Sequence, residues 1–148
     1  METNITLAAM RPPESLVATN VCEQLREAAS RRYYIWSSMI LPAVANAIVR
    51  DATTLSRIRL AQTALAIERY RAQHNRPPEN LMDLTPAFLS ILPIDSFTGE
   101  PLRYRRMDNG FVIYSVGRDG FDNGGLEMPL NAKSNDIGNY DLTFTVLR

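Results

Sequence analysis

The feature that most constrains this chain is a change in the spacing of its apolar residues near the middle of the sequence. Between Leu55 and Arg71, apolar side chains recur at the three- and four-residue spacing of an α-helix. Pro77 and Pro78 end that pattern, because the residue before a proline avoids the helical region. After Gly99 the spacing changes to two, which is the alternation of a half-buried strand. A long helix followed by strands predicts an α+β fold.

Two helices are expected in the N-terminal half. The first spans residues 13–31, where proline in the opening turn precedes apolar residues at helical spacing. The second begins before or at Pro42, which lies in its first turn or kinks it, and runs to about His74. Its apolar residues form two stripes, which predicts two packing partners: the sheet for one, and the first helix or another chain for the other. The stripes are Leu60, Ala64 and Ile67, and Ile58, Ala61 and Leu65.

Three strands are expected in the C-terminal half, at residues 102–106, 111–116 and 142–146. Asn109-Gly110 lies between the first two, and this dipeptide is the signature of a tight hairpin turn. Residues 117–139 are rich in Gly, Asp and Asn, which predicts a long acidic loop. We therefore expect long N-terminal helices packed on a small three-stranded antiparallel sheet, with residues 58–70 covering the sheet.

Composition limits the classes of function that the chain can have. Sixteen basic and sixteen acidic side chains give a net charge of zero, so no general attraction to nucleic acid is expected. Cys22 is the only cysteine, which excludes an intrachain disulfide and a thiolate metal cluster. No secretory signal peptide is expected, and the most apolar stretch, 33–49, is too short to span a membrane, although peripheral membrane contact stays open. We expect a tail and helical segment at 1–41 and one domain at 42–148.

Three motifs follow one another along the second half of the chain. A helix end with its Pro-Pro passage occupies 66–81, a Leu-Pro-Ile-Asp-Ser-Phe-Thr-Gly-Glu-Pro turn occupies 92–101, and Tyr-Ser-Val-Gly-Arg-Asp-Gly occupies 114–120. With the closing acidic residues Asp136 and Asp141, they resemble the C-terminal domain of the major pseudopilin (protein G) of the type II secretion system. The resemblance covers about 95 of the 148 residues. It is closer still to a variant of this domain at the C-terminus of longer uncharacterised bacterial proteins.

The resemblance implies a non-enzymatic assembly or protein-binding domain of a bacterial envelope or secretion system. Its partners would be other proteins or further copies of the chain. The basic leader, the processing site and the spanning helix of a major pseudopilin have no match in this sequence. We therefore expect either a domain used in another role or a truncated accessory domain of a larger bacterial protein, without independent activity.

The resemblance also implies one Ca²⁺ ion in the loop after the hairpin. The carboxylates that would bind it are Asp119, Asp122, Asp136 and Asp141. The chemistry agrees, because calcium takes about six to eight oxygen ligands from a chain that can wrap around it. Asp, Asn and Gly are also the ordinary residues of loops, so plain turn formation remains the alternative explanation.

A small metal-dependent hydrolase, with the acidic loop as its centre, is the competing interpretation. Such a site needs a base close to the metal, and the only histidine, His74, lies at the end of the long helix. Ser115 lacks the Gly-x-Ser-x-Gly context of a hydrolase nucleophile. We therefore expect no catalytic residues. Arginine and tyrosine alternate at 103–106, which suits nucleic acid or a half-exposed strand, and the zero net charge favours the strand.

Overall fold

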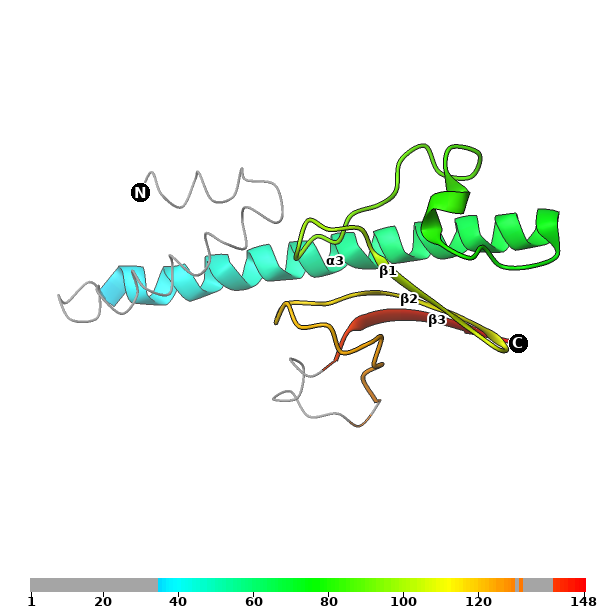
Figure 1. The fold of residues 1–148 in the computed structure, drawn as a ribbon. Helices are drawn as coiled ribbons and strands as arrows, with labels where there is room; N and C mark the ends of the chain where they lie inside the picture. Colours follow the sequence, from blue (N-terminus) through cyan, green and yellow to red (C-terminus); the bar gives the residue numbers. More distant parts are fainter. Residues whose placement is uncertain (1–34, 130, 132–139) are drawn as a thin grey trace. The chain divides into compact units, whose positions relative to one another are not determined.

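The structure, a computed structural model, describes residues 35–129, 131 and 140–148. The chain divides into two compact units, Met1–Ala52 and Thr53–Arg148, and the second unit holds the sheet. The helix expected at 13–31 lies outside the described residues. The described elements are, in order, α3 (Ile35–His74), the 3₁₀ helix η1 (Leu81–Leu84), β1 (Arg103–Met107), β2 (Gly110–Ser115) and β3 (Leu142–Leu147) (Figure 1).

The helix α3 contains 40 residues and has Pro42 inside it, so it begins before that proline. Arg71 and His74 occupy its last turn, where positive charge complements the negative end of the helix dipole. The helix ends where Asn75 takes a left-handed conformation (φ 56°), a common way of closing a helix. Within the described part of the chain, no helix is long and apolar enough to cross a membrane.

The three strands form one antiparallel sheet in the order β1-β2-β3, as the alternating pattern predicts. Met107 pairs with Gly110, so the hairpin turn consists of Asp108 and Asn109, one residue earlier than the Asn-Gly dipeptide itself. Gly110 has a positive φ of 156°, and a Cβ atom there would lie 1.9 Å from the carbonyl oxygen of Val146. The glycine is therefore required where β2 passes β3, because any side chain would collide with the backbone.

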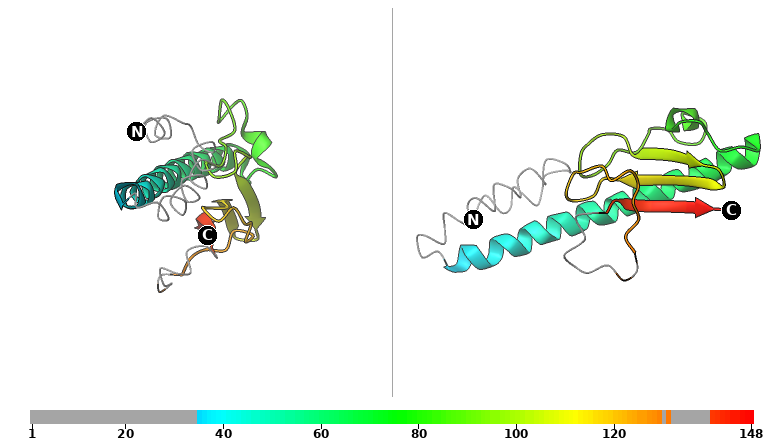
Figure 2. Two further views of the ribbon diagram at one scale, coloured as in Figure 1. Left: turned by 90° about the vertical axis from the view of Figure 1, so that its left-hand side faces the viewer. Right: turned by 60° about the horizontal axis from the view of Figure 1, so that its bottom comes forward.

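One stripe of α3 packs on the sheet and forms the core of the second unit, which confirms the α+β prediction (Figures 1 and 2). Leu60 and Ile67 are at most 1 % exposed and share this core with Phe111 and Ile113 of β2. The remaining buried members are Ala64, Ala66, Leu81, Leu84 and Leu102. Burial of these apolar side chains supplies the main driving force for folding.

The second stripe of α3 stays largely open to solvent. Ile58 is 50 % exposed and Leu65 is 67 % exposed. The sheet covers the other stripe, and the partner predicted for this one, the first helix or another chain, stays a prediction.

The connection between α3 and β1 is attached to the rest of the unit through Pro78 and through Leu81 and Leu84 of η1, which belong to the core. Asn80 and Asp83 form a capping box at the start of η1. The hydroxyl of Tyr104 in β1 donates to the carbonyl of Pro78 at 2.9 Å. This contact ties the Pro-Pro passage to the sheet.

Candidate functional site

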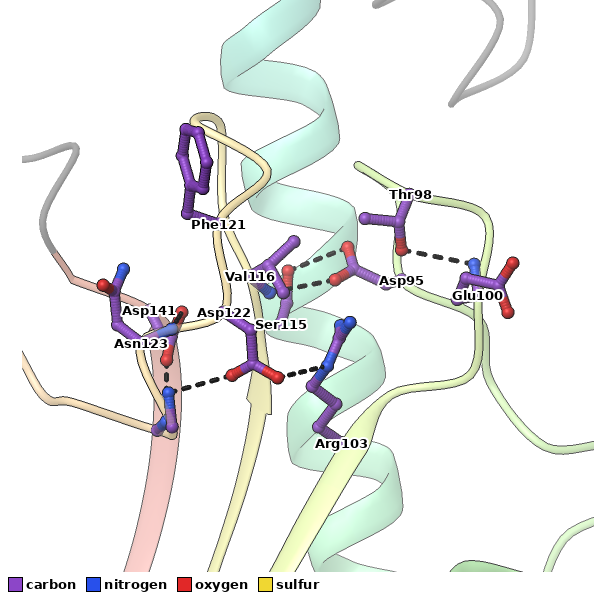
Figure 3. A network of polar contacts seen from close by, with 12 residues as sticks. Asp95, Thr98, Glu100, Arg103, Ser115, Val116, Phe121, Asp122, Asn123 and Asp141 are labelled. Carbon is purple, nitrogen blue, oxygen red and sulfur yellow. Dashed lines mark hydrogen bonds and ion pairs between the residues drawn. The ribbon is translucent and has the colours of Figure 1, made fainter.

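A fully buried carboxylate, Asp95, connects the turn before β1 to the end of β2 (Figure 3). Its Oδ1 accepts hydrogen bonds from the amide of Phe97 and the hydroxyl of Ser115, each at 2.8 Å. Its Oδ2 accepts from the amide of Val116 at 3.0 Å. A buried charge is tolerated when it is hydrogen-bonded on all sides, so Asp95 acts as a polar centre for two segments that are distant in sequence.

The same turn is attached to the long helix by Arg59. Its Nη1 donates to the carbonyl of Ile94 at 2.7 Å and to the hydroxyl of Ser96 at 3.2 Å. The turn closes on itself through the amide of Asp95, which donates to the carbonyl of Glu100 at 2.7 Å. Helix, turn and sheet are thus joined by polar contacts next to the apolar core.

The loop that follows β2 is held to the sheet by an ion pair. Asp122 Oδ2 lies 2.9 Å from the Nε of Arg103 in β1, and its Oδ1 accepts from the amide of Gly124 at 2.9 Å (Figure 3). Burial raises the pKa of the Tyr114 hydroxyl, and the charge of Asp122, to which it is hydrogen-bonded, raises that pKa further. The arginine that offsets loop charge comes from a neighbouring strand and not from the loop.

Asp141 holds the far end of the same loop. It is 4 % exposed, and its two carboxylate oxygens accept from the amides of Asn123 at 3.3 Å and Gly125 at 2.7 Å. Its own amide donates to the carbonyl of Leu126 at 3.1 Å. The residue therefore shapes the loop by binding backbone N–H groups immediately before β3 begins.

The four carboxylates predicted to bind calcium have different surroundings in the structure. Asp122 and Asp141 act on the same short stretch, 122–125, whereas Asp119 makes a local turn by accepting from the amide of Phe121 at 3.2 Å. Asp136 lies outside the described residues. Among the residues that are described, no group of three or more His, Cys, Asp or Glu side chains could hold a metal ion. Calcium binding by the whole set remains a prediction.

A hollow of about 320 Å³ opens beside Asp141 in the second unit. Its lining combines the apolar Phe97 and Leu142 with Arg57, Arg118 and Glu127 at its polar parts. The lining therefore carries both signs of charge. Its volume is at the small end of the range for ligand pockets.

The sequence interpretation missed Asp95 and Arg103, the two residues that organise these contacts. Asp95 carried one recognisable signal in the sequence. It lies in a turn bounded by Pro and Gly, where an Asp side chain commonly accepts a hydrogen bond from the backbone amide two residues later. Arg103 carried no such signal in the sequence, because its pairing with Asp122 depends on how the loop folds back over the sheet.

The candidate base His74 stacks on Tyr70, with ring centroids 4.1 Å apart, and its Nδ1 lies 3.0 Å from the carbonyl oxygen of Tyr70.

The candidate nucleophile Ser115 is fully buried and donates its hydroxyl to Asp95, which gives it a place in the polar centre described above. The amide of the next residue, Val116, donates to the same carboxylate.

Compared with known proteins, the chain matches no protein-family model, no curated protein and no solved structure.

Proposed function

We propose that the unit Thr53–Arg148 is a pseudopilin-like, non-enzymatic assembly or protein-binding domain of a bacterial envelope or secretion system. The observation that carries the proposal is the open stripe of α3, where Leu65 is 67 % exposed directly beside the stripe that forms the core. An apolar stripe on a rigid helix is a surface that another protein can cover.

The resemblance supports the proposal because two of its three motifs touch each other in the fold and the first is bonded to β1 between them. Asp95 of the second motif binds Ser115 of the third. Pro78 of the first motif accepts a hydrogen bond from Tyr104, which stands between the other two. The second and third motifs are thus bonded directly, and the first is bonded to β1, the strand that lies between them in sequence.

A metal-dependent hydrolase remains the competing function. Its centre would have to include Asp122 and Asp141, and both carboxylates already bind groups of the protein itself, Arg103 and loop amides. A catalytic metal site keeps an open coordination position with a base nearby. These contacts favour the assembly proposal over the hydrolase.

The assembly proposal can be tested by placing a photo-crosslinking amino acid at Leu65 of the full chain in its native cells. The same substitution at the exposed Glu100 serves as the control, because Glu100 is a polar residue of the 92–101 turn and not part of the stripe. We expect protein adducts at Leu65 that are absent at Glu100 and that mass spectrometry assigns to envelope or secretion proteins, or to the chain itself. Equal or absent adducts at the two positions would contradict the proposal.

A further inference from the structure

We propose that the outer edge of β3 pairs antiparallel with β3 of a second copy of this chain. The inference rests on the proposed assembly function and names one partner and one surface for it. The sheet order β1-β2-β3 leaves β3 at an edge.

The backbone of β3 presents unused hydrogen-bonding groups at this edge. The amide of Arg148 donates to the carbonyl of Asn109, so even-numbered residues of β3 direct their backbone groups toward β2. Since these directions alternate, Thr143, Thr145 and Leu147 direct theirs outward. Among the described residues, none bonds to these outward groups, and just before the strand the amide of Asp141 donates to the carbonyl of Leu126.

The two edges of the sheet differ in protection. β1 contains Arg103, Arg105 and Arg106, and charged side chains discourage the addition of a further strand. β3 reads Leu-Thr-Phe-Thr-Val-Leu, with no charge and no proline, and its four central residues favour strands. An uncharged edge of this composition favours pairing with another strand.

The flank of β3 is apolar as well. Phe144 is 41 % exposed, although its position in the register, opposite Ile113, places it on the helix-facing side of the sheet. Arg148 forms an ion pair with Glu68 of α3, which joins the end of β3 to that part of the helix. Leu65 lies three residues before Glu68 and therefore on the same side of the helix. An added strand would cover Phe144 and approach the open stripe that Leu65 belongs to.

A second copy fits this edge because the strand is complementary to itself. Pairing Thr145 with Thr145 of the copy brings two outward-facing residues together across a two-fold axis, which is the symmetry of most dimers. The same register sets Phe144 against Val146, and Thr143 against Leu147. No like charges meet within the strand, and the terminal Arg148 is already paired with Glu68. Pairing of the two extended strands also gives hydrogen-bond partners to the outward N–H and C=O groups of both copies of β3.

Disulfide trapping in the full chain tests this register directly. In a Cys22→Ser background, Thr145→Cys would place two thiols at a hydrogen-bonded antiparallel pair, with Cα atoms about 5.5 Å apart, within disulfide range. The control Thr143→Cys would offset its two thiols by four residues, about 13 Å along the strands, which is beyond disulfide range. We expect a covalent dimer from Thr145→Cys and its loss with Thr143→Cys. Equal trapping at both positions, or none at Thr145→Cys, would overturn the register.

Sedimentation velocity of the uncrosslinked chain gives an independent measurement. Thr145→Pro removes an N–H that points away from β2, so the bonds within the sheet are kept while the edge is blocked. We expect a concentration-dependent dimer that is lost in Thr145→Pro, with Thr145→Val retaining it. A monomer at every concentration would overturn the edge pairing. If adducts to other proteins still formed at Leu65, the assembly function would stand without this partner.

Discussion

Replacing Asp95 by asparagine should strongly destabilise the unit Thr53–Arg148, because this buried carboxylate accepts three hydrogen bonds. The donors are the amides of Phe97 and Val116 and the hydroxyl of Ser115, at 2.8 to 3.0 Å. Asparagine has the same shape but replaces one acceptor oxygen by an NH₂ group. In either orientation of the asparagine amide, the NH₂ group faces a backbone N–H, that of Phe97 or that of Val116, and two donors cannot bond to each other.

The size of the effect follows from these contacts. One buried N–H group that loses its acceptor costs about 1–3 kcal/mol, and the bonds to the remaining oxygen weaken because the charge is gone. Relief from burying that charge offsets part of the loss. We expect a net decrease of about 2–4 kcal/mol in the free energy of unfolding. For a unit of this length that corresponds to a decrease in Tm of about 10 °C or more.

Urea unfolding followed by circular dichroism measures this change. The matched control is Asp108→Asn, the same chemical replacement at an exposed residue of the hairpin turn, where we expect little change. Combining Asp95→Asn with Ser115→Ala in a double-mutant cycle should show a coupling of about 1 kcal/mol or more, since the two side chains are bonded. A urea midpoint of Asp95→Asn equal to that of Asp108→Asn would refute the reasoning.

Three further predictions concern the sheet and its loop. Gly110→Ala should lower Tm by several degrees, because its new Cβ atom would lie 1.9 Å from the carbonyl oxygen of Val146, and an unchanged Tm would contradict this contact. The pKa of the Tyr114 hydroxyl is raised in the folded protein. The contribution of Tyr114 to stability is therefore complete below the pKa of the unfolded chain, about 10, and is lost as the pH rises through the pKa of the folded state. Tyr114→Phe should therefore show a smaller alkaline loss of stability than the wild type in denaturation measured from pH 8 to 11. If the loop binds calcium, Tm should be higher with Ca²⁺ than with chelator, and Asp119→Ala should abolish the difference, whereas equal wild-type midpoints would reject calcium.

The elements of this fold follow from local sequence patterns. The strands predicted at 102–106, 111–116 and 142–146 occur at Arg103–Met107, Gly110–Ser115 and Leu142–Leu147. The helix predicted to end at about His74 ends there. Spacing of apolar residues, prolines after the helix and the Asn-Gly dipeptide act over a few residues, so the sequence by itself contains this information.

The sequence indicated carboxylates in and beside the loop of residues 117–139, as calcium ligands or as plain turn formers, but it did not indicate their partners in the protein. Asp122 and Asp141 act together on the loop, whereas Asp119 forms a separate local turn. The charge of Asp122 is offset by Arg103, 19 positions earlier in the sequence, and no local pattern marks such a pair. Long-range electrostatic partners are set by how segments fold back on one another.

Only the tertiary structure decided which apolar residues are core and which are surface. Both stripes of α3 have the same helical spacing, yet Ile67 is fully buried and Leu65 is 67 % exposed. It also decided that Asp95 is buried, because the turn and β2 meet around it. The spacing of apolar residues along a helix shows that one of its faces is apolar, but the element that covers this face comes from elsewhere in the sequence. The open edge of β3 is likewise decided by the tertiary structure. The alternating sequence pattern predicts a strand, but only the position of β3 at the end of the sheet leaves it with a single neighbouring strand.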